Sequence, residues 1–105
     1  ETKIYHNYFD KNFNLISPGK TLQKNSVNIA IKFVKMGKVK EAEKILRPAV
    51  KYLIKKNCKK IILGCTELPI AIFAYKSFKK AKDSKLFVDP NLLLAQVCMR
   101  KYKNY

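Results

Sequence analysis

The sequence predicts a three-layer α/β domain built on a short parallel sheet. Apolar residues recur every three or four positions over residues 21–37 and 39–56, which is the spacing of amphipathic helices. Residues 61–64 instead form a continuous apolar run, typical of a strand buried on both faces. A second such run, residues 86–88, follows a further helical stretch. Strands that alternate with helices indicate a parallel sheet covered by helices.

The first third of the chain is predicted to contain a short helix, a strand and a longer helix. Residues 4–9 carry apolar side chains at the spacing of one helix face, and residues 13–16 read as a short strand. The turn signal Ser17-Pro18-Gly19 closes that strand. A helix then starts near Thr21 and ends at Gly37. Its predicted apolar stripe consists of Val27, Ala30, Ile31 and Val34.

A second helix is predicted over residues 39–56. Pro48 lies inside it and has no backbone N–H, so we expect a kink or a broken first half. Asn57 follows the last lysines and is expected to cap the helix in a left-handed conformation. The predicted buried face comprises Ala42, Ile45, Leu46, Ala49, Val50, Leu53 and Ile54.

The second half continues the alternation but leaves the sheet short. After the strand at residues 61–64, a helix starts near Thr66 and carries Leu68, Ile72 and Phe73. A basic loop at 79–84 leads to the strand at 86–88, which Asp89-Pro90 ends before a last helix over 91–100. Only three strands are predicted, and the chain begins on a helix. A parallel sheet normally has more strands, so we expect one to be missing ahead of Glu1.

Composition and cysteine usage fit one small cytoplasmic domain spanning residues 1–105. The chain is 48% hydrophobic, and no apolar run approaches the roughly 20 residues that cross a bilayer. Its start has no signal-peptide layout. Cys58, Cys65 and Cys98 form no CxxC pair and have no His cluster nearby. We therefore expect free thiols, and neither a disulfide framework nor a metal site.

The chain is strongly basic, with 23 Lys plus Arg against 7 Asp plus Glu and a formal net charge of +16. Such an excess attracts nucleic acid or anionic membranes. Nearly all of it is Lys, however, spread through every segment, with only Arg47 and Arg100 as guanidinium groups. We therefore expect a solvated surface, with neither nucleic acid nor a membrane as partner. A nucleic-acid surface would require lysines clustered on one face.

The most informative segment is Gly64-Cys65-Thr66-Glu67-Leu68-Pro69, directly after the predicted strand. That strand delivers Cys65 to the carboxyl edge of the sheet, where open α/β folds place their ligands. A thiol just before a helix N-terminus is expected to have a lowered pKa, which favours thiolate. Thr66 is a natural N-cap, and its hydroxyl or amide can donate to a substrate carboxylate. The alternative is that Cys65 is only a small buried apolar residue.

This motif resembles the C-terminal cysteine motif of the aspartate/glutamate racemase superfamily. The Glu-Leu-Pro continuation resembles the aspartate branch, since the glutamate branch usually has His-Tyr-Pro there. The flanking segments resemble the family too: the strand ending in Pro18, the helix end at residues 31–37, and residues 86–90 with the final helix. The resemblance implies the C-terminal lobe of such an enzyme, with a flavodoxin-like, Rossmann-like fold.

The resemblance also implies a mechanism. Two lobes face each other, and each contributes a cysteine. One thiolate removes the α-proton of the amino acid, and the other thiol returns a proton to the opposite face. Carried onto this chain, Cys65 is the catalytic acid/base, Thr66 contacts the substrate carboxylate, and Thr2 and Lys35 are further substrate contacts. No cofactor, neither pyridoxal phosphate nor a metal, is implied. Cys58 and Cys98 match nothing catalytic.

The chain departs from the family in lacking the first lobe, its cysteine and one central strand. The expected partners are therefore a small acidic amino acid, a separate chain carrying the N-terminal lobe, and further copies of this chain. The final helix would lack the lobe against which it packs. The alternative function is a catalytically inactive racemase-like binding or assembly module, which does not need Cys65 as a reactive thiol.

Overall fold

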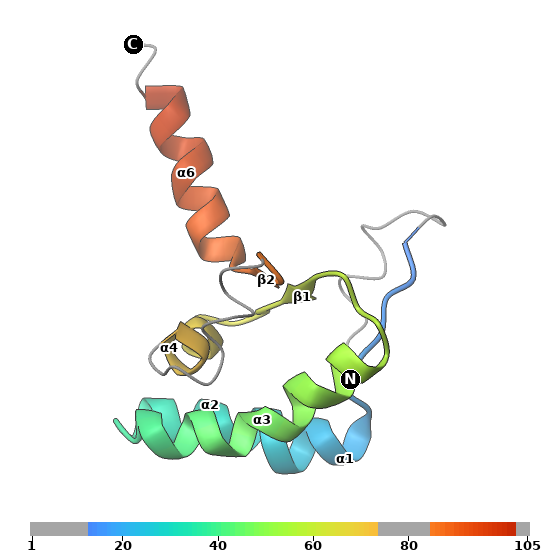
Figure 1. Cartoon of the computed structure of the whole chain (residues 1–105). Helices are drawn as coiled ribbons and strands as arrows, with labels where there is room; N and C mark the ends of the chain where they lie inside the picture. Colours follow the sequence, from blue (N-terminus) through green and yellow to red (C-terminus); the bar gives the residue numbers. More distant parts are fainter. Residues whose placement is uncertain (1–12, 74–84, 103–105) are drawn as a thin grey trace.

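The computed structural model of the chain describes residues 13–73 and 85–102. The predicted helix at 4–9, the basic loop at 79–84 and Thr2 lie outside these residues. Within them the fold is a mixed α/β arrangement in which helices predominate over a short parallel sheet (Figure 1). None of the described helices is long and apolar enough to cross a membrane.

The first helical stretch runs without a break through three segments: α1 (Lys20–Leu22), η2 (Gln23–Val27) and α2 (Asn28–Lys35). The stretch matches the prediction for residues 21–37, but the wider π-helical turn of η2 was not predicted. The side-chain amide of Gln23 donates to the Asn28 Oδ1 at 2.8 Å, and this five-residue separation matches the repeat of a π turn. The buried Ser26 hydroxyl donates to the Ile45 carbonyl, which ties η2 to the next helix.

Helix α3 (Val39–Lys55) passes through Pro48 as a single helix, so of the two expected outcomes, a kink or a broken first half, the break is wrong. Pro48 lies on the exposed side of the helix, where water can hydrate the carbonyl that has lost its N–H partner. The opposite side of α3 is buried at Ala42, Leu46, Ala49, Val50 and Leu53. Those five burials were predicted. Ile45 is only partly buried, and Ile54 is exposed, contrary to the prediction.

Gly37 and Asn57 end the two long helical stretches in the same way. Both are left-handed, with φ of 75° and 62°. In each case the residue's N–H donates to the carbonyl three residues back, and the next N–H donates to the carbonyl five back. This is the Schellman motif, which satisfies carbonyls at a helix end. Both predicted helix ends are therefore confirmed.

The described sheet consists of β1 (Ile61–Ile62) and β2 (Phe87–Val88), paired in parallel with Ile61 opposite Phe87. The Ile61 N–H donates to the Leu86 carbonyl at 2.8 Å. The Leu63 N–H donates to the Val88 carbonyl at 2.9 Å. The alternation of strands and helices in the sequence predicted a parallel sheet, and the parallel pairing of these two strands confirms it.

The predicted strand at residues 13–16 is wrong, because residues 13–19 have no regular secondary structure. Phe13 and Ile16 are exposed, and the sheet of the described residues contains no strand from this segment. A strand is stabilised by its ladder, and the described sheet includes no ladder with residues 13–16.

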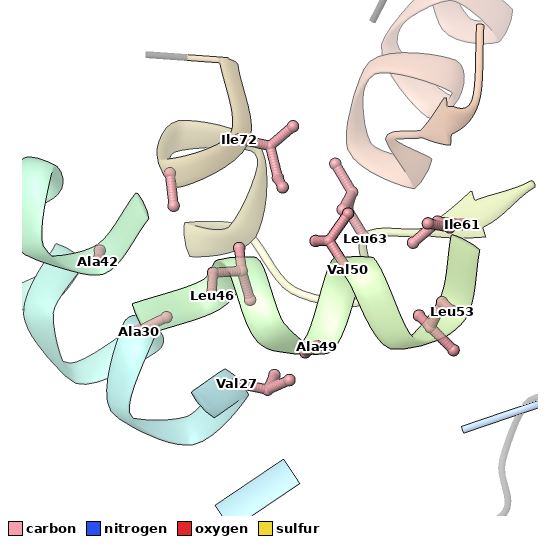
Figure 2. Close-up of a cluster of buried hydrophobic side chains, with 11 residues drawn as sticks. Val27, Ala30, Ala42, Leu46, Ala49, Val50, Leu53, Ile61, Leu63 and Ile72 are labelled. Carbon is pink, nitrogen blue, oxygen red and sulfur yellow. The ribbon is translucent and has the colours of Figure 1, made fainter. Parts of the chain in front are cut away.

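The core lies between α2, α3, α4 (Glu67–Phe73) and one side of β1 (Figure 2). Val27 and Ala30 face α3 from η2 and α2, while Leu46 and Val50 lie between that layer and Ile72 of α4. Leu68 and Phe73 pack against the same cluster, as predicted for this helix. The Phe73 and Phe87 rings meet edge to face, 6.2 Å between centroids, which links α4 to β2.

Helix α6 (Pro90–Tyr102) starts at a cap that the sequence signals clearly. The Asp89 carboxylate accepts hydrogen bonds from the backbone N–H groups of Asn91 at 3.0 Å and Leu92 at 3.3 Å. From this cap α6 extends away from the other helices (Figure 1), and residues 91–102 are all exposed. Its apolar residues have no covering layer in the part of the chain that the structure describes.

Candidate functional site

Cys65 lies on the short bend that connects β1 to α4, and Thr66 directly precedes the first residue of that helix. Leu63 anchors the incoming chain, because it is 3% exposed and its N–H pairs with β2. Ala71 and Ile72 anchor the outgoing helix in the core. The bend between these two anchors leaves Cys65 half-buried and Thr66 exposed. The thiol is therefore held in a fixed turn and stays accessible from one side.

Glu67, the first residue of α4, joins the other polar groups of this turn. Its Oε2 accepts a hydrogen bond from the Thr66 hydroxyl at 3.1 Å. Its Oε1 lies 3.9 Å from the Lys35 Nζ, which comes from the last residue of α2. The Glu67 carboxylate and the Cys65 thiol also shift each other's pKa. Packing of α2 against α4 makes this meeting of distant segments possible.

The pKa of the Cys65 thiol is raised, which corrects the prediction of a lowered value. Burial is the largest cause, because it disfavours the charged thiolate. The backbone N–H groups of Leu68 and Glu67 donate toward the sulfur and lower the pKa, as the helix N-terminus argument expects. The Glu67 side chain opposes them, since it accepts the thiol proton in a hydrogen bond and its negative charge repels a thiolate. Cys65 is therefore a protonated thiol at neutral pH.

The pKa of the Glu67 carboxyl is lowered. Its own backbone N–H is the largest cause, followed by the Thr66 hydroxyl. Partial burial opposes the shift, and the Cys65 thiol and the Lys35 ammonium then add to it. The Lys35 side chain is 65% exposed, so its ion pair with Glu67 is weak and readily rearranged. The resting turn thus combines a neutral thiol, a carboxylate and an exposed ammonium.

The structure brings together three of the four predicted site residues, because Cys65, Thr66 and Lys35 all interact with Glu67. Thr2 lies outside the described residues. Glu67 was not among the predicted site residues. The sequence could have indicated Glu67 as a site residue, because it directly follows Cys65-Thr66 and is the first residue of the predicted helix. A side chain at that position lies close to the preceding turn.

The remaining cysteines lie away from this turn. Cys58 follows the left-handed Asn57 and packs partly against the core. Cys98 is exposed on α6. Within the described residues, no group of three His, Cys, Asp or Glu side chains is arranged to hold a metal ion.

No protein-family model, no curated protein and no solved structure matches this chain. Its function is therefore inferred from its residues and from the geometry of the turn.

Proposed function

We propose that the chain is a flavodoxin-like lobe that supplies one of two acid/base thiols to a cofactor-independent racemase of aspartate or a similar acidic amino acid. The observation that carries the proposal is the convergence of Cys65, Thr66 and Lys35 on Glu67 at the carboxyl end of β1. These are the residues that the racemase resemblance selects. They reach one place from two separate segments of the chain.

In the resting site Cys65 is suited to donating a proton. Its S–H bond breaks as the proton passes to the substrate α-carbon, and the sulfur keeps the electron pair as a thiolate. The backbone N–H groups of Glu67 and Leu68 stabilise that thiolate. A thiolate on the other lobe removes the original α-proton from the opposite face. Opposed donor and acceptor account for inversion, and fixed positions supply the proximity that a carbon acid requires.

Lys35 and Thr66 provide the recognition of an anionic substrate. Both are exposed beside the thiol, and an ammonium with a hydroxyl suits a carboxylate. A substrate carboxylate would replace the Glu67 carboxylate as the partner of Lys35. This exchange costs little because the ion pair is long and largely solvated. Thr2 remains a further proposed contact.

The test is deuterium exchange at the α-carbon in D₂O, followed by NMR on L- and D-aspartate separately. We expect no measurable racemisation by the isolated chain, because one thiol serves only one face. In the isolated chain Cys65 itself must remove the α-proton and return a deuteron to the same face, which requires its thiolate form. Because the pKa of this thiol is raised, we expect slow exchange of one enantiomer that becomes faster at alkaline pH. The exchange should be abolished in Cys65→Ser and retained in the matched variant Cys98→Ser. Exchange that is absent from the wild-type chain, or unchanged in Cys65→Ser, would contradict the proposal. Full turnover that disappears in Cys65→Ser would show instead that two copies of Cys65 meet.

A second candidate function is an inactive, racemase-like assembly module. Exposed α6 favours it, because Leu92, Leu93, Leu94, Val97 and Met99 are all exposed there. A helix that is apolar on several sides is normally buried. This function predicts that Cys65→Ser leaves association with other chains unchanged and that no α-proton exchange occurs. The exchange experiment therefore separates the two candidates.

A further inference from the structure

Four lysines form a straight row on the exposed side of α3. Lys40, Lys44, Lys51 and Lys55 are all exposed, and their intervals of four, seven and four residues keep them on one face of the helix. Because an α-helix rises about 1.5 Å per residue, the row is about 22 Å long. The buried face of α3, with Leu46 and Leu53, lies on the other side and holds the row in place. We call these four lysines the basic row.

Carboxylates near the basic row do little to neutralise it. Glu43 is 1% exposed and is held by Arg47, whose guanidinium nitrogens lie 2.8 Å from both carboxylate oxygens. Glu41 is exposed beside the first turn of α3, but within residues 13–73 and 85–102 no ion pair joins it to a lysine. Beyond the helix the positive charge continues at exposed Lys56 and Lys59. The basic row therefore presents four exposed positive charges along one side of α3.

The expectation of no nucleic-acid partner assumes lysines spread through every segment. On α3, however, the fold aligns four lysines on one face of a single helix. Clustering of lysines on one face is what a nucleic-acid surface requires. We propose that the basic row binds the phosphate backbone of duplex DNA without sequence preference. This function is separate from the racemase proposal and uses none of the residues around Cys65.

The chemistry of the basic row favours phosphates over an acidic protein. Exposed ion pairs with protein carboxylates contribute little each, and four of them do not offset the freedom lost on association. Duplex DNA carries condensed counterions, and their release adds a favourable term for each phosphate contacted. Lysines interact with phosphates as point charges, whereas sequence-specific recognition relies on side chains that make bidentate hydrogen bonds to base edges. The guanidinium nearest the row, Arg47, is already engaged with Glu43, which argues for backbone contact alone.

The test is fluorescence anisotropy of the full chain with a short, labelled DNA duplex of mixed sequence between about 50 and 200 mM salt. We expect a Kd of about 10⁻⁴ to 10⁻⁶ M at physiological salt. In Lys44→Gln/Lys51→Gln the slope of log K against log salt should become shallower by about 0.9 for each phosphate that the variant no longer neutralises. The control is Arg100→Gln/Lys101→Gln, which removes the same charge from α6. Circular dichroism checks that both variants fold.

Three outcomes would overturn the proposal. Equal weakening by the two double variants would assign binding to net charge alone. No binding to the duplex at about 50 mM salt would exclude the row as a DNA surface. Tighter binding of an RNA duplex or of a Glu-rich helical peptide, with no competition from DNA, would assign the row to that partner. Cys65→Ser should bind DNA like the wild-type chain, which keeps this test independent of the racemase proposal.

Discussion

The Thr66 hydroxyl donates a hydrogen bond to the Glu67 carboxylate at 3.1 Å, and the same carboxylate pairs with Lys35 and raises the pKa of the Cys65 thiol. One side chain of α4 therefore opposes the effect of the N-terminus of that helix on the pKa of the thiol. The backbone N–H groups favour the thiolate, whereas the carboxylate two residues after Cys65 favours the protonated thiol. Burial is the largest cause of the raised pKa, and the carboxylate adds to it.

Glu67→Gln should therefore lower the pKa of Cys65. The substitution removes the repulsive charge and the strong acceptor, while the backbone donors remain. In the wild-type chain the rate of Cys65 alkylation by iodoacetamide should rise only at a pH above that of an ordinary thiol, and in Glu67→Gln at a lower pH. Mass spectrometry of the Cys65 peptide across a pH series measures both profiles. Glu41→Gln on α3 is the matched control, and an unchanged profile in Glu67→Gln would contradict the role assigned to the carboxylate.

At neutral pH, Cys98 should be alkylated before Cys65. A low thiol pKa at the helix N-terminus would have made Cys65 the fastest to react, but its raised pKa and half-buried position reverse that order. Cys98 is exposed on α6 and open to reagent. Time-resolved labelling with iodoacetamide distinguishes the three thiols by peptide mass. Labelling of Cys65 first would show that the thiolate is favoured after all.

Leu46→Ala should destabilise the chain by about 2–5 kcal/mol, because it removes a side chain from the centre of the core and leaves a cavity. Leu46 is 3% exposed and lies between α3 and Ile72 of α4 (Figure 2). Leu94→Ala is the matched control, since Leu94 is 64% exposed and its truncation should change stability by less than about 0.5 kcal/mol. Urea denaturation at low protein concentration measures both. Equal destabilisation would place Leu94 in the folded core.

Helix α6 should support association between copies of the chain. Its exposed apolar residues favour burial, whereas the net charge of +16 opposes it, so added salt should strengthen association. Sedimentation at micromolar concentration should show a dimer or larger species. Leu93→Asp, with Lys85→Gln as a control away from α6, should shift the chain toward monomer. A compact wild-type monomer at all salt concentrations would refute the prediction.

Features set by a few adjacent residues could be predicted from the sequence. Gly37 and Asn57 take the left-handed conformation, which glycine and asparagine adopt more readily than other residues. Asp89-Pro90 likewise marks the start of α6. The apolar run at residues 61–64 likewise contains β1, because a continuous apolar run is typical of a buried strand.

Features that depend on distant segments were not predicted correctly. Residues 13–16 have strand-like composition, yet strand formation requires a neighbouring strand that composition does not reveal. The raised pKa of Cys65 follows mainly from burial of the thiol and in smaller part from the Glu67 side chain, and a helix-dipole argument leaves both out. Meeting of Lys35 with Glu67 requires the packing of α2 on α4. Only the family resemblance suggested that Lys35 belongs near Cys65.

The parallel pairing of β1 with β2 also sets the order in which the chain folds. Helices α2 and α3 are neighbours in sequence and pack directly, so their packing closes only a short turn. Pairing of Ile62 with Val88 closes a loop of residues 63–87, which costs conformational entropy. Only a few hydrogen bonds between β1 and β2 offset that cost. We expect the helical pair to form early and the sheet late. In native-state hydrogen exchange, the Leu63 amide should therefore exchange faster than the Val50 amide inside α3.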